Sequence, residues 1–473
     1  MPCARPEGSP ALSIALTSSS KRIFQAGDTI TGHVVRRAHM VAPECRITIR
    51  LLGRAKTKIV ITRGNGNGGT RHETYRSRYH FFGPETSSVL FSGPLHVAEQ
   101  GDPATFPFAV TIPTCPSANL SREAQGNSFL PTDPASVATQ MLPPSYTSNH
   151  HHKEGYVEYW LEAQLSPGPG TNNKAVTAAQ STQPILLGAP NTREPAPPRI
   201  VKTLASPAHS ITSYNLIPGM NEVSLSLKQK SKQFFHTSSV PSLAYAVHVG
   251  LPVVMQLQPN EAIPLTLRLS PTAAGTSDDV RKTTQKATIN YMTVHLKQYT
   301  VIRAGEHFFG GPREESMSDT IDLHFDKALK SLPAPMVVDI DADGEPVNLG
   351  ALFDLRLSES GFSSGTDKLA SHWFGPPITT DFVTYNMTAS HALKVAVSVT
   401  VCGKEHVDTF KFDTRIMAPP AIAAAVPRNG ANNATEIEAR PAPPSFAEAM
   451  HGADRPPDYK PKPAPSEKVP EKA

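Results

Sequence analysis

The sequence predicts an all-β protein built from antiparallel β-sandwiches. Apolar and polar residues alternate along many short segments, Gly- and Pro-containing turns bound these segments, and long helical periodicity is nearly absent. Alternation with a period of two buries one face of a strand and exposes the other. Many short strands joined by such turns are typical of sandwich folds.

The expected strands follow from runs in which every second residue is apolar. In chain order, these positions are Leu12, Ile14 and Leu16; Ile47, Ile49 and Leu51; Leu265, Leu267 and Leu269; Met292, Val294 and Leu296; and Leu393, Val395, Val397, Val399 and Val401. Turn signals bound the runs at Gly27–Asp28, 64–69, 101–103 and Gly403–Lys404. Each run therefore predicts a strand with one buried face.

The length of 473 residues allows two or three domains with sizeable cores. We expect one sandwich over 11–188, a Pro-rich hinge linker over 189–199 and a second sandwich over 200–418. Residues 419–473 combine many prolines with few large apolar side chains and balanced charges. Such a composition cannot offset the entropy of ordering, so this segment is predicted to be a disordered Pro-rich tail.

Composition and cysteine spacing narrow the class of protein. The net charge of +4 is mild and argues neither for nor against an acidic partner. No nucleic-acid partner is expected. No Cys-x-x-Cys pair occurs, so neither a zinc site nor a dense disulfide framework is predicted. The absence of a signal-peptide pattern and of an apolar run of spanning length predicts a cytoplasmic protein with reduced thiols. The cysteines are Cys3, Cys45, Cys115 and Cys402.

Motifs that would indicate an enzyme or a metal site receive little support. No His-Glu-x-x-His occurs, no Gly-x-Gly-x-x-Gly opens an expected helix, and the acidic runs Glu314–Glu315 and 339–343 are expected in loops. Adjacent residues such as His150–His152 point in different directions, so a polar loop is favoured over a metal site. The 64–69 segment lacks a following Lys-Ser/Thr and is expected to be a long hairpin loop. We therefore expect no catalytic residue, no metal and no cofactor.

The residues Pro456, Pro457 and Tyr459 form a Pro-Pro-x-Tyr motif inside the predicted tail. Two prolines pre-set the polyproline II helix, so little entropy is lost when the segment docks. WW domains bind such segments with an aromatic groove for the prolines and a second pocket for the tyrosine. The motif therefore predicts a partner that contains WW domains, notably a HECT-type ubiquitin ligase.

Two related segments are weaker candidates for WW-domain docking. Pro443-Pro444-Ser445-Phe446 lacks the tyrosine hydroxyl, which leaves a polar partner unpaired at a cost of about 1 kcal/mol or more. Pro143-Pro144-Ser145-Tyr146 precedes an expected strand. Its tyrosine is therefore predicted to pack inside the protein rather than to dock.

Several segments, in order along the chain, resemble those of fungal-type α-arrestins, which are arrestin-like trafficking adaptors with N- and C-terminal arrestin domains. Residues 24–32 resemble the family's aromatic-x-x-Gly-Asp-x-apolar-x-Gly segment. Its Gly-Asp pair makes a tight turn, and Gly32 lets a neighbouring strand approach. The other matching segments are 49–57, 106–108, 142–146, 156–163 and 383–404. The resemblance covers about 11–417 and implies two arrestin-like β-sandwich domains.

The resemblance also implies a function. Such adaptors recognise the cytosolic tails of plasma-membrane transporters or receptors and recruit a HECT-type ligase through Pro-Pro-x-Tyr motifs, so that ubiquitin is attached to the cargo and the cargo is internalised. The protein would then be cytoplasmic and recruited peripherally to the plasma membrane or endosomes. The alternative is an arrestin-like scaffold or sorting protein, for ambient-pH signalling or retromer-like sorting, that acts without a ligase.

Basic residues surround the 64–69 segment. An acidic lipid or a phosphorylated cargo tail is a candidate contact for them, since each charge adds up to about 1 kcal/mol at an anionic membrane surface. A solvated hairpin is the favoured interpretation. The residues are Lys56, Lys58, Arg63, Arg71, Arg76 and Arg78.

Overall fold

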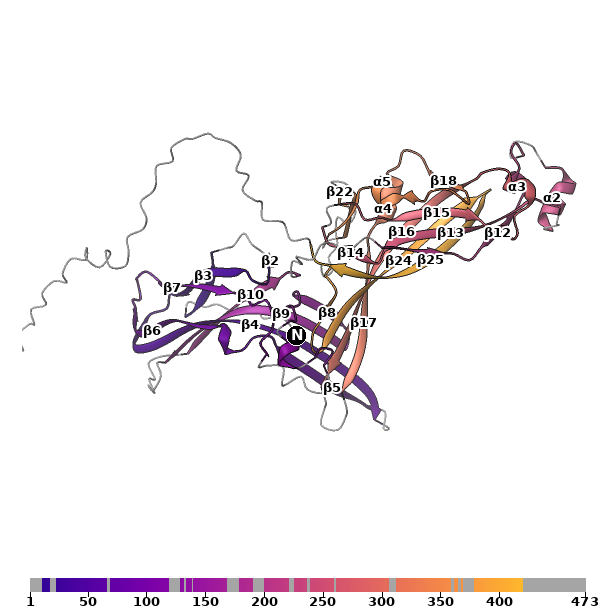
Figure 1. The fold of residues 1–473 in the computed structure, drawn as a ribbon. Helices are drawn as coiled ribbons and strands as arrows, with labels where there is room; N and C mark the ends of the chain where they lie inside the picture. Colours follow the sequence, from indigo (N-terminus) through magenta and orange to yellow (C-terminus); the bar gives the residue numbers. More distant parts are fainter. Residues whose placement is uncertain are drawn as a thin grey trace, which may run out of the picture. The chain divides into compact units, whose positions relative to one another are not determined.

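The fold was analysed in a computed structural model of the chain (Figure 1). All of its strands lie within the unit Met1–Ala421. The structure describes residues 11–17, 23–65, 69–118, 128–131, 133–137, 139–167, 178–189, 200–220, 225–235, 239–258, 261–305, 312–358, 361–364, 367–368 and 378–419. The predicted tail, apart from its first residue, and most of the predicted hinge therefore lie outside the described residues.

The first part of the chain forms two facing sheets, which we call the first sandwich. One sheet has the order β1-β3-β7, and the other has the order β2-β10-β9-β4-β5, with β6 paired to β4 and β8 paired to β9. The elements are β1 (Ser13–Leu16), β2 (Ile23–Phe24), β3 (Thr29–Arg36), β4 (Met40–Asn65), β5 (Gly69–His80), β6 (Ser87–Val97), β7 (Ala104–Thr111), α1 (Pro134–Val137), β8 (Tyr146–His150), β9 (Lys153–Pro167) and β10 (Ala179–Leu187). Apart from the short parallel pair of β2 with β10, these strands pair antiparallel.

The remainder of the described chain is built on one large curled sheet, which we call the second sandwich. The main strand order of this sheet is β11-β13-β15-β18-β16-β24-β25-β14, with β12, β17, β19 and β23 paired to its members, and β20-β21-β22 form a separate small sheet. The strands are β11 (Val201–Ala205), β12 (His209–Thr212), β13 (Ser242–Pro252), β14 (Val254–Gln256), β15 (Thr266–Pro271), β16 (Gln285–Ala304), β17 (Arg313–Asp322), β18 (Met336–Ile340), β19 (Val347–Asn348), β20 (Leu355–Ser358), β21 (Gly361–Ser364), β22 (Asp367–Lys368), β23 (Phe382–Val383), β24 (Met387–Val401) and β25 (Lys404–Met417). The helices are α2 (Leu227–Phe234), α3 (Asp278–Arg281), α4 (Phe325–Lys330) and α5 (Leu349–Leu352).

The alternating runs form the cores of both sandwiches, which confirms the predicted all-β sandwich class. Ile47, Ile49 and Leu51 lie on β4 and are fully buried. In the second sandwich, Val395 and Val397 are also fully buried. They lie on β24, which pairs with β16 on one side and β25 on the other. The period-two alternation therefore predicted these strands correctly, because one face of each strand packs in the core.

Two glycine-dependent predictions are also confirmed. Gly27 has a positive φ of 91°, and the backbone N–H of Asp28 donates to the carbonyl of Gln25 in a tight turn. Gly32 lies on β3 opposite Leu16 of β1. A Cβ atom at Gly32 would lie 2.4 Å from the carbonyl oxygen of Ala15, so the two strands can approach this closely only without a side chain there.

The long strands of the second sandwich reach into the core of the first. Strands β16 and β24 run side by side (Figure 1), and residues at their ends, Ile302 and Met387, join the first core together with Met317 of β17. The Thr57 hydroxyl on β4 donates to the Arg303 carbonyl (2.5 Å). The two predicted domains are thus joined by a shared apolar layer and by hydrogen bonds.

Candidate functional site

The predicted ligase-docking residues come after the last strand that the structure describes. This strand, β25, ends at Met417, and both tail motifs follow it in the sequence. Pro456, Pro457 and Tyr459, and the weaker candidates Pro443, Pro444 and Phe446, lie outside the described residues. Their role as a docking site remains a prediction.

The segment Pro143-Pro144-Ser145-Tyr146 is built into the first sandwich. Tyr146 begins β8 with a side chain that is only 5% exposed, and its ring packs edge-on against Phe382 with centroids 5.1 Å apart. The Tyr159 hydroxyl donates to the Pro143 carbonyl (2.8 Å), and both prolines are buried. A WW domain needs an exposed Pro pair and an exposed tyrosine. These residues are buried instead, as predicted for a tyrosine that packs inside the protein.

Tyr146 also begins a buried polar chain that links the two sandwiches. Gln298 on β16 donates from Nε2 to the Tyr146 hydroxyl oxygen (2.9 Å), and that hydroxyl lies 2.5 Å from the Thr300 hydroxyl. The other amide atom of Gln298, Oε1, lies 3.0 Å from Nε2 of His391 on β24. The opposite ring nitrogen, Nδ1, lies 2.6 Å from an Asp381 carboxylate oxygen.

The members of this polar chain are paired with one another, and all except the half-buried Asp381 are buried. Gln298 and Thr300 have no exposed surface, and the His391 side chain has none either. Burial raises the pKa of Tyr146, and the two hydrogen bonds oppose that rise. A buried polar group without a partner is costly, whereas a fully paired network fixes one arrangement of the strands that carry it. The polar chain therefore serves to set how β8, β16 and β24 meet, rather than to present a reactive group to solvent.

Carboxylates neutralise several of the predicted basic residues. Strands β4 and β9 place basic and acidic residues directly opposite one another. Arg54 pairs with Glu158 (2.5 Å) and lies over the Trp160 ring, and Lys58 pairs with Glu154 (2.9 Å). Arg50 pairs with Glu162 in the same ladder, and Glu73 faces both Arg63 (3.3 Å) and Arg71 (3.9 Å) on the β4–β5 hairpin.

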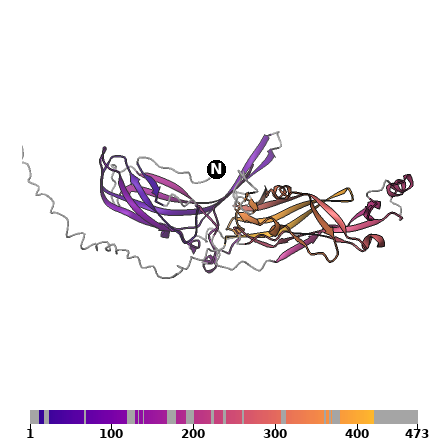
Figure 2. The same ribbon diagram turned by 90° about the horizontal axis from the view of Figure 1, so that it is seen from above.

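The predicted hairpin is present, but its strands continue into the segment 64–69, which was expected to be a long loop. Strands β4 and β5 pair as far as Asn65 and Gly69, and the hairpin projects beyond the rest of its sheet (Figure 2). Burial, and next the neighbouring Arg54, lower the pKa of Lys56, while Arg76 and Arg78 are exposed. This pairing favours a solvated hairpin over a dedicated anion site.

The three adjacent histidines make separate contacts. His150 lies 3.0 Å from Asp319 on β17, His151 adopts a positive φ of 42° in the β8–β9 turn, and His152 lies near the His72 ring. In the described part of the chain, no three His, Cys, Asp or Glu side chains are grouped to hold a metal ion. The three positions therefore act as turn and surface residues here.

The expectation that Glu314 and Glu315 lie in a loop was wrong. Both lie on β17, where Glu314 pairs with Arg303 (2.8 Å) and Glu315 with Lys153 (2.7 Å). The strand is largely polar because much of its length is exposed, so the apolar alternation that indicates a strand is weak. In the other acidic run, residue 339 belongs to the end of β18, and residues 341–343 follow the strand.

The sequence contains one Gly-x-Ser-x-Gly match, over 361–365, which the expectation of no catalytic residue wrongly took to be absent. In hydrolases this motif places serine at a sharp turn between a strand and a helix. Ser363 instead lies within β21, paired antiparallel with β20 on one side and β22 on the other. The match therefore lacks the geometry that would activate its serine.

Sequence reasoning missed both the buried polar chain and α2. The residues of the polar chain are far apart in the sequence, and no local pattern brings them together. A signal for α2 was present, because Ser226 and Gln229 form a capping box in which each side chain binds the other's backbone N–H. The helix was overlooked because its two turns are too short to show a helical period in the sequence.

Comparison with known proteins does not identify the chain, since no family model and no curated protein matches it. Among the described residues, no helix is both long enough and apolar enough to cross a membrane.

Proposed function

We propose that the protein is an adaptor that links plasma-membrane transporters or receptors to a HECT-type ubiquitin ligase. The observation that carries the proposal is the motif Pro456, Pro457 and Tyr459, which follows the last described strand in the sequence. The resemblance of the preceding strands to those of α-arrestins supports the same proposal. In this arrangement the folded body binds the cytosolic tail of the cargo, and the Pro-Pro-x-Tyr motif binds a WW domain of the ligase.

The chemistry of the motif explains why few residues suffice. Prolines already favour the polyproline II conformation, so docking costs little conformational entropy. The upstream Pro443-Pro444-Ser445-Phe446 segment has a ring but no hydroxyl. Because Pro143-Pro144-Ser145-Tyr146 is buried, only one full motif is left for docking, and it lacks the avidity of two, which is worth on the order of 100-fold for linked sites. We therefore expect transient docking to a single WW domain.

The test is binding of the full-length chain to isolated WW domains from HECT-type ligases, measured by titration calorimetry. Tyr459→Ala is expected to weaken binding at least about tenfold, because the ring pocket is left empty. Asp458→Ala is the matched control, since the x position of the motif tolerates substitution, and it should retain binding. Phe446→Tyr should strengthen binding to a tandem WW protein by creating a second full motif.

Binding that is indifferent to Tyr459, or absent in the wild-type chain, would contradict the ligase-adaptor proposal. The alternative function, a scaffold or sorting protein that acts without a ligase, would then be favoured. Its partner would have to be sought on the folded body.

A further inference from the structure

Three large apolar side chains are exposed together on and beside α2. Leu227 is 86% exposed, Phe234 77% and Phe235 70%, and they are the most exposed large apolar side chains in the described part of the chain. Single exposed apolar residues are common on protein surfaces, whereas a local group of them marks an interaction site more often. Helix α2 lies at one end of the second sandwich in both views (Figures 1 and 2).

Helix α2 combines exposed apolar residues with basic ones. Leu227 and Phe234 are seven positions apart and therefore lie on the same side of the helix, two turns from each other. Lys228 and Lys232, four positions apart, lie together on another side, whereas Lys230, four positions before Phe234, flanks the apolar side. Residues Leu227–Phe234 contain no Asp or Glu. The helix is thus short, basic and amphipathic, with its apolar side turned to solvent.

Hydrogen bonds hold α2 to the sandwich. The backbone N–H of Tyr214 donates to Oε1 of Gln233, so the helix is attached through its polar side and not through its phenylalanines. The next residue back, Ser213, donates its N–H to the Pro241 carbonyl (3.0 Å). Because Pro241 precedes β13, this bond connects the Ser213–Tyr214 segment, which holds α2, to the start of that strand.

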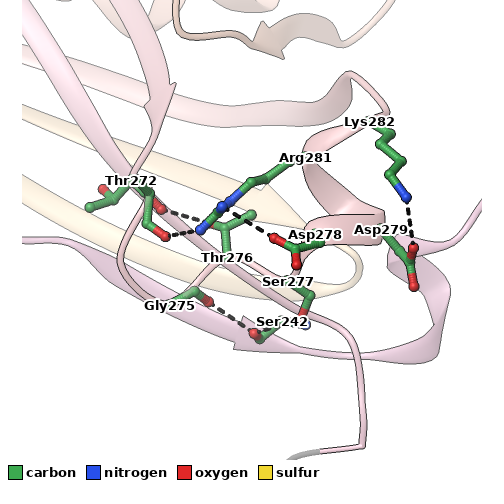
Figure 3. A network of polar contacts seen from close by, with 10 residues as sticks. Ser242, Thr272, Gly275, Thr276, Ser277, Asp278, Asp279, Arg281 and Lys282 are labelled. Carbon is green, nitrogen blue, oxygen red and sulfur yellow. Dashed lines mark hydrogen bonds and ion pairs between the residues drawn. The ribbon is translucent and has the colours of Figure 1, made fainter.

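A second set of polar contacts fixes the same end of the sandwich (Figure 3). Ser242 donates its N–H to the Ser277 hydroxyl (2.9 Å) and its own hydroxyl to the Gly275 carbonyl (2.9 Å). The acidic residues of the adjacent α3 are already paired, Asp278 with Arg281 (3.2 Å) and the next aspartate with Lys282 (3.3 Å). The acidic charges of α3 are therefore largely balanced and do not neutralise α2.

We propose that α2 and Phe235 form a membrane anchor that binds the surface of an anionic bilayer. The apolar side chains would enter the boundary between headgroups and acyl chains, and the exposed Lys228 and Lys230 would contact the phosphates and carboxylates of lipids such as phosphatidylserine. This anchor is distinct from the basic hairpin of the first sandwich, and it does not depend on ligase docking.

The charge and size of α2 favour a bilayer over a protein partner. Eight residues of helix are only about 12 Å long, so this helix alone offers much less surface than the roughly 800 Å² that each partner buries in a stable protein interface. Two copies of the chain facing each other through α2 would bring their lysines together and repel. A bilayer needs only a few inserted side chains, and an anionic surface attracts the same lysines.

The test is co-sedimentation of the full-length protein with vesicles of phosphatidylcholine, with or without phosphatidylserine. Binding is expected to require phosphatidylserine and to weaken as the salt concentration rises. Phe234→Ser with Phe235→Ser should reduce vesicle binding by more than about tenfold. Lys228→Ala with Lys230→Ala should reduce it by about tenfold or more, since each lysine contributes about fivefold at an anionic surface.

The matched control is Leu352→Ser, because Leu352 is also exposed (56%) but lies on α5. It should bind vesicles as the wild type does, and all variants should keep the wild-type unfolding midpoint because the changed side chains are exposed. The proposal is overturned if the wild type does not bind, if it binds neutral vesicles equally well, or if the Phe234 and Phe235 changes leave binding intact. It is also overturned if the wild type is a dimer that these changes convert to a monomer, since α2 would then be a self-association surface.

Discussion

The Tyr146 hydroxyl is expected to stabilise the junction between the two sandwiches, and Tyr146→Phe tests this directly. The substitution keeps the ring and its edge contact with Phe382 but removes one oxygen. That oxygen accepts from Gln298 and is paired with Thr300. Both partners are fully buried, so the loss leaves a buried amide N–H and a buried hydroxyl with one partner fewer.

The magnitude follows from the number of bonds lost. Each buried hydrogen bond contributes about 1 kcal/mol net, and an unsatisfied buried group costs about 1–3 kcal/mol. We expect Tyr146→Phe to lower the free energy of unfolding by about 2 kcal/mol. Tyr385→Phe is the matched control: Tyr385 is also buried, but its hydroxyl has no partner among the described residues. Removing that hydroxyl should be neutral or slightly stabilising.

The assay is urea unfolding followed by tryptophan fluorescence, since Trp160 lies on β9 next to the junction strands. The free energy of unfolding is compared among the wild type and the two Tyr→Phe variants. The reasoning is refuted if Tyr146→Phe is as stable as the wild type, or if Tyr385→Phe is the more damaging change. Either outcome would mean that the polar chain does not contribute to the folded state as its geometry indicates.

Three further outcomes are expected. Gly32→Ala should destabilise the protein by about 1–3 kcal/mol because its methyl group would meet the Ala15 carbonyl, whereas Gly64→Ala, whose Cβ would meet nothing within 4 Å, should not change the urea midpoint. Burial lowers the pKa of His406, so on acidification the histidine gains its proton in the unfolded state before it does so in the folded state. Stability should therefore fall as the pH drops below about 6.5. In His406→Gln, the thermal midpoint should depend less on pH in this range. Burial raises the pKa of Tyr245 to about 12, so stability should decline as pH rises from about 10 toward that value, and Tyr245→Phe should reduce the decline seen by circular dichroism.

The core strands were predictable because their signal is local. Ile47, Ile49 and Leu51 alternate within five residues, and burial of one face follows from the geometry of a strand. The tight turn at Gly27 was predictable for the same reason, since a positive φ favours glycine. The polar strand β17 was missed because an exposed strand needs no apolar alternation.

The junction was not predictable because it depends on contacts between distant parts of the chain. Gln298 and His391 read as ordinary polar positions in two separate strands, and only the pairing of β16 with β24 brings them into hydrogen-bonding distance. The packing of Tyr146 was anticipated from its place before a strand, but its partners were not. A single sequence gives the period of a strand, whereas the neighbour of each buried polar atom is set by the register of the whole sheet.

The two binding experiments use different residues, so together they divide the functional alternatives. WW binding that needs Tyr459, combined with vesicle binding that needs Phe234 and Phe235, would indicate an adaptor that reaches the membrane before it meets cargo. WW binding without vesicle binding would leave cargo recognition as the step that brings the ligase to the membrane. Vesicle binding without WW binding would favour a membrane-recruited scaffold, because an exposed basic and apolar helix has a use at a bilayer whether or not a ligase follows.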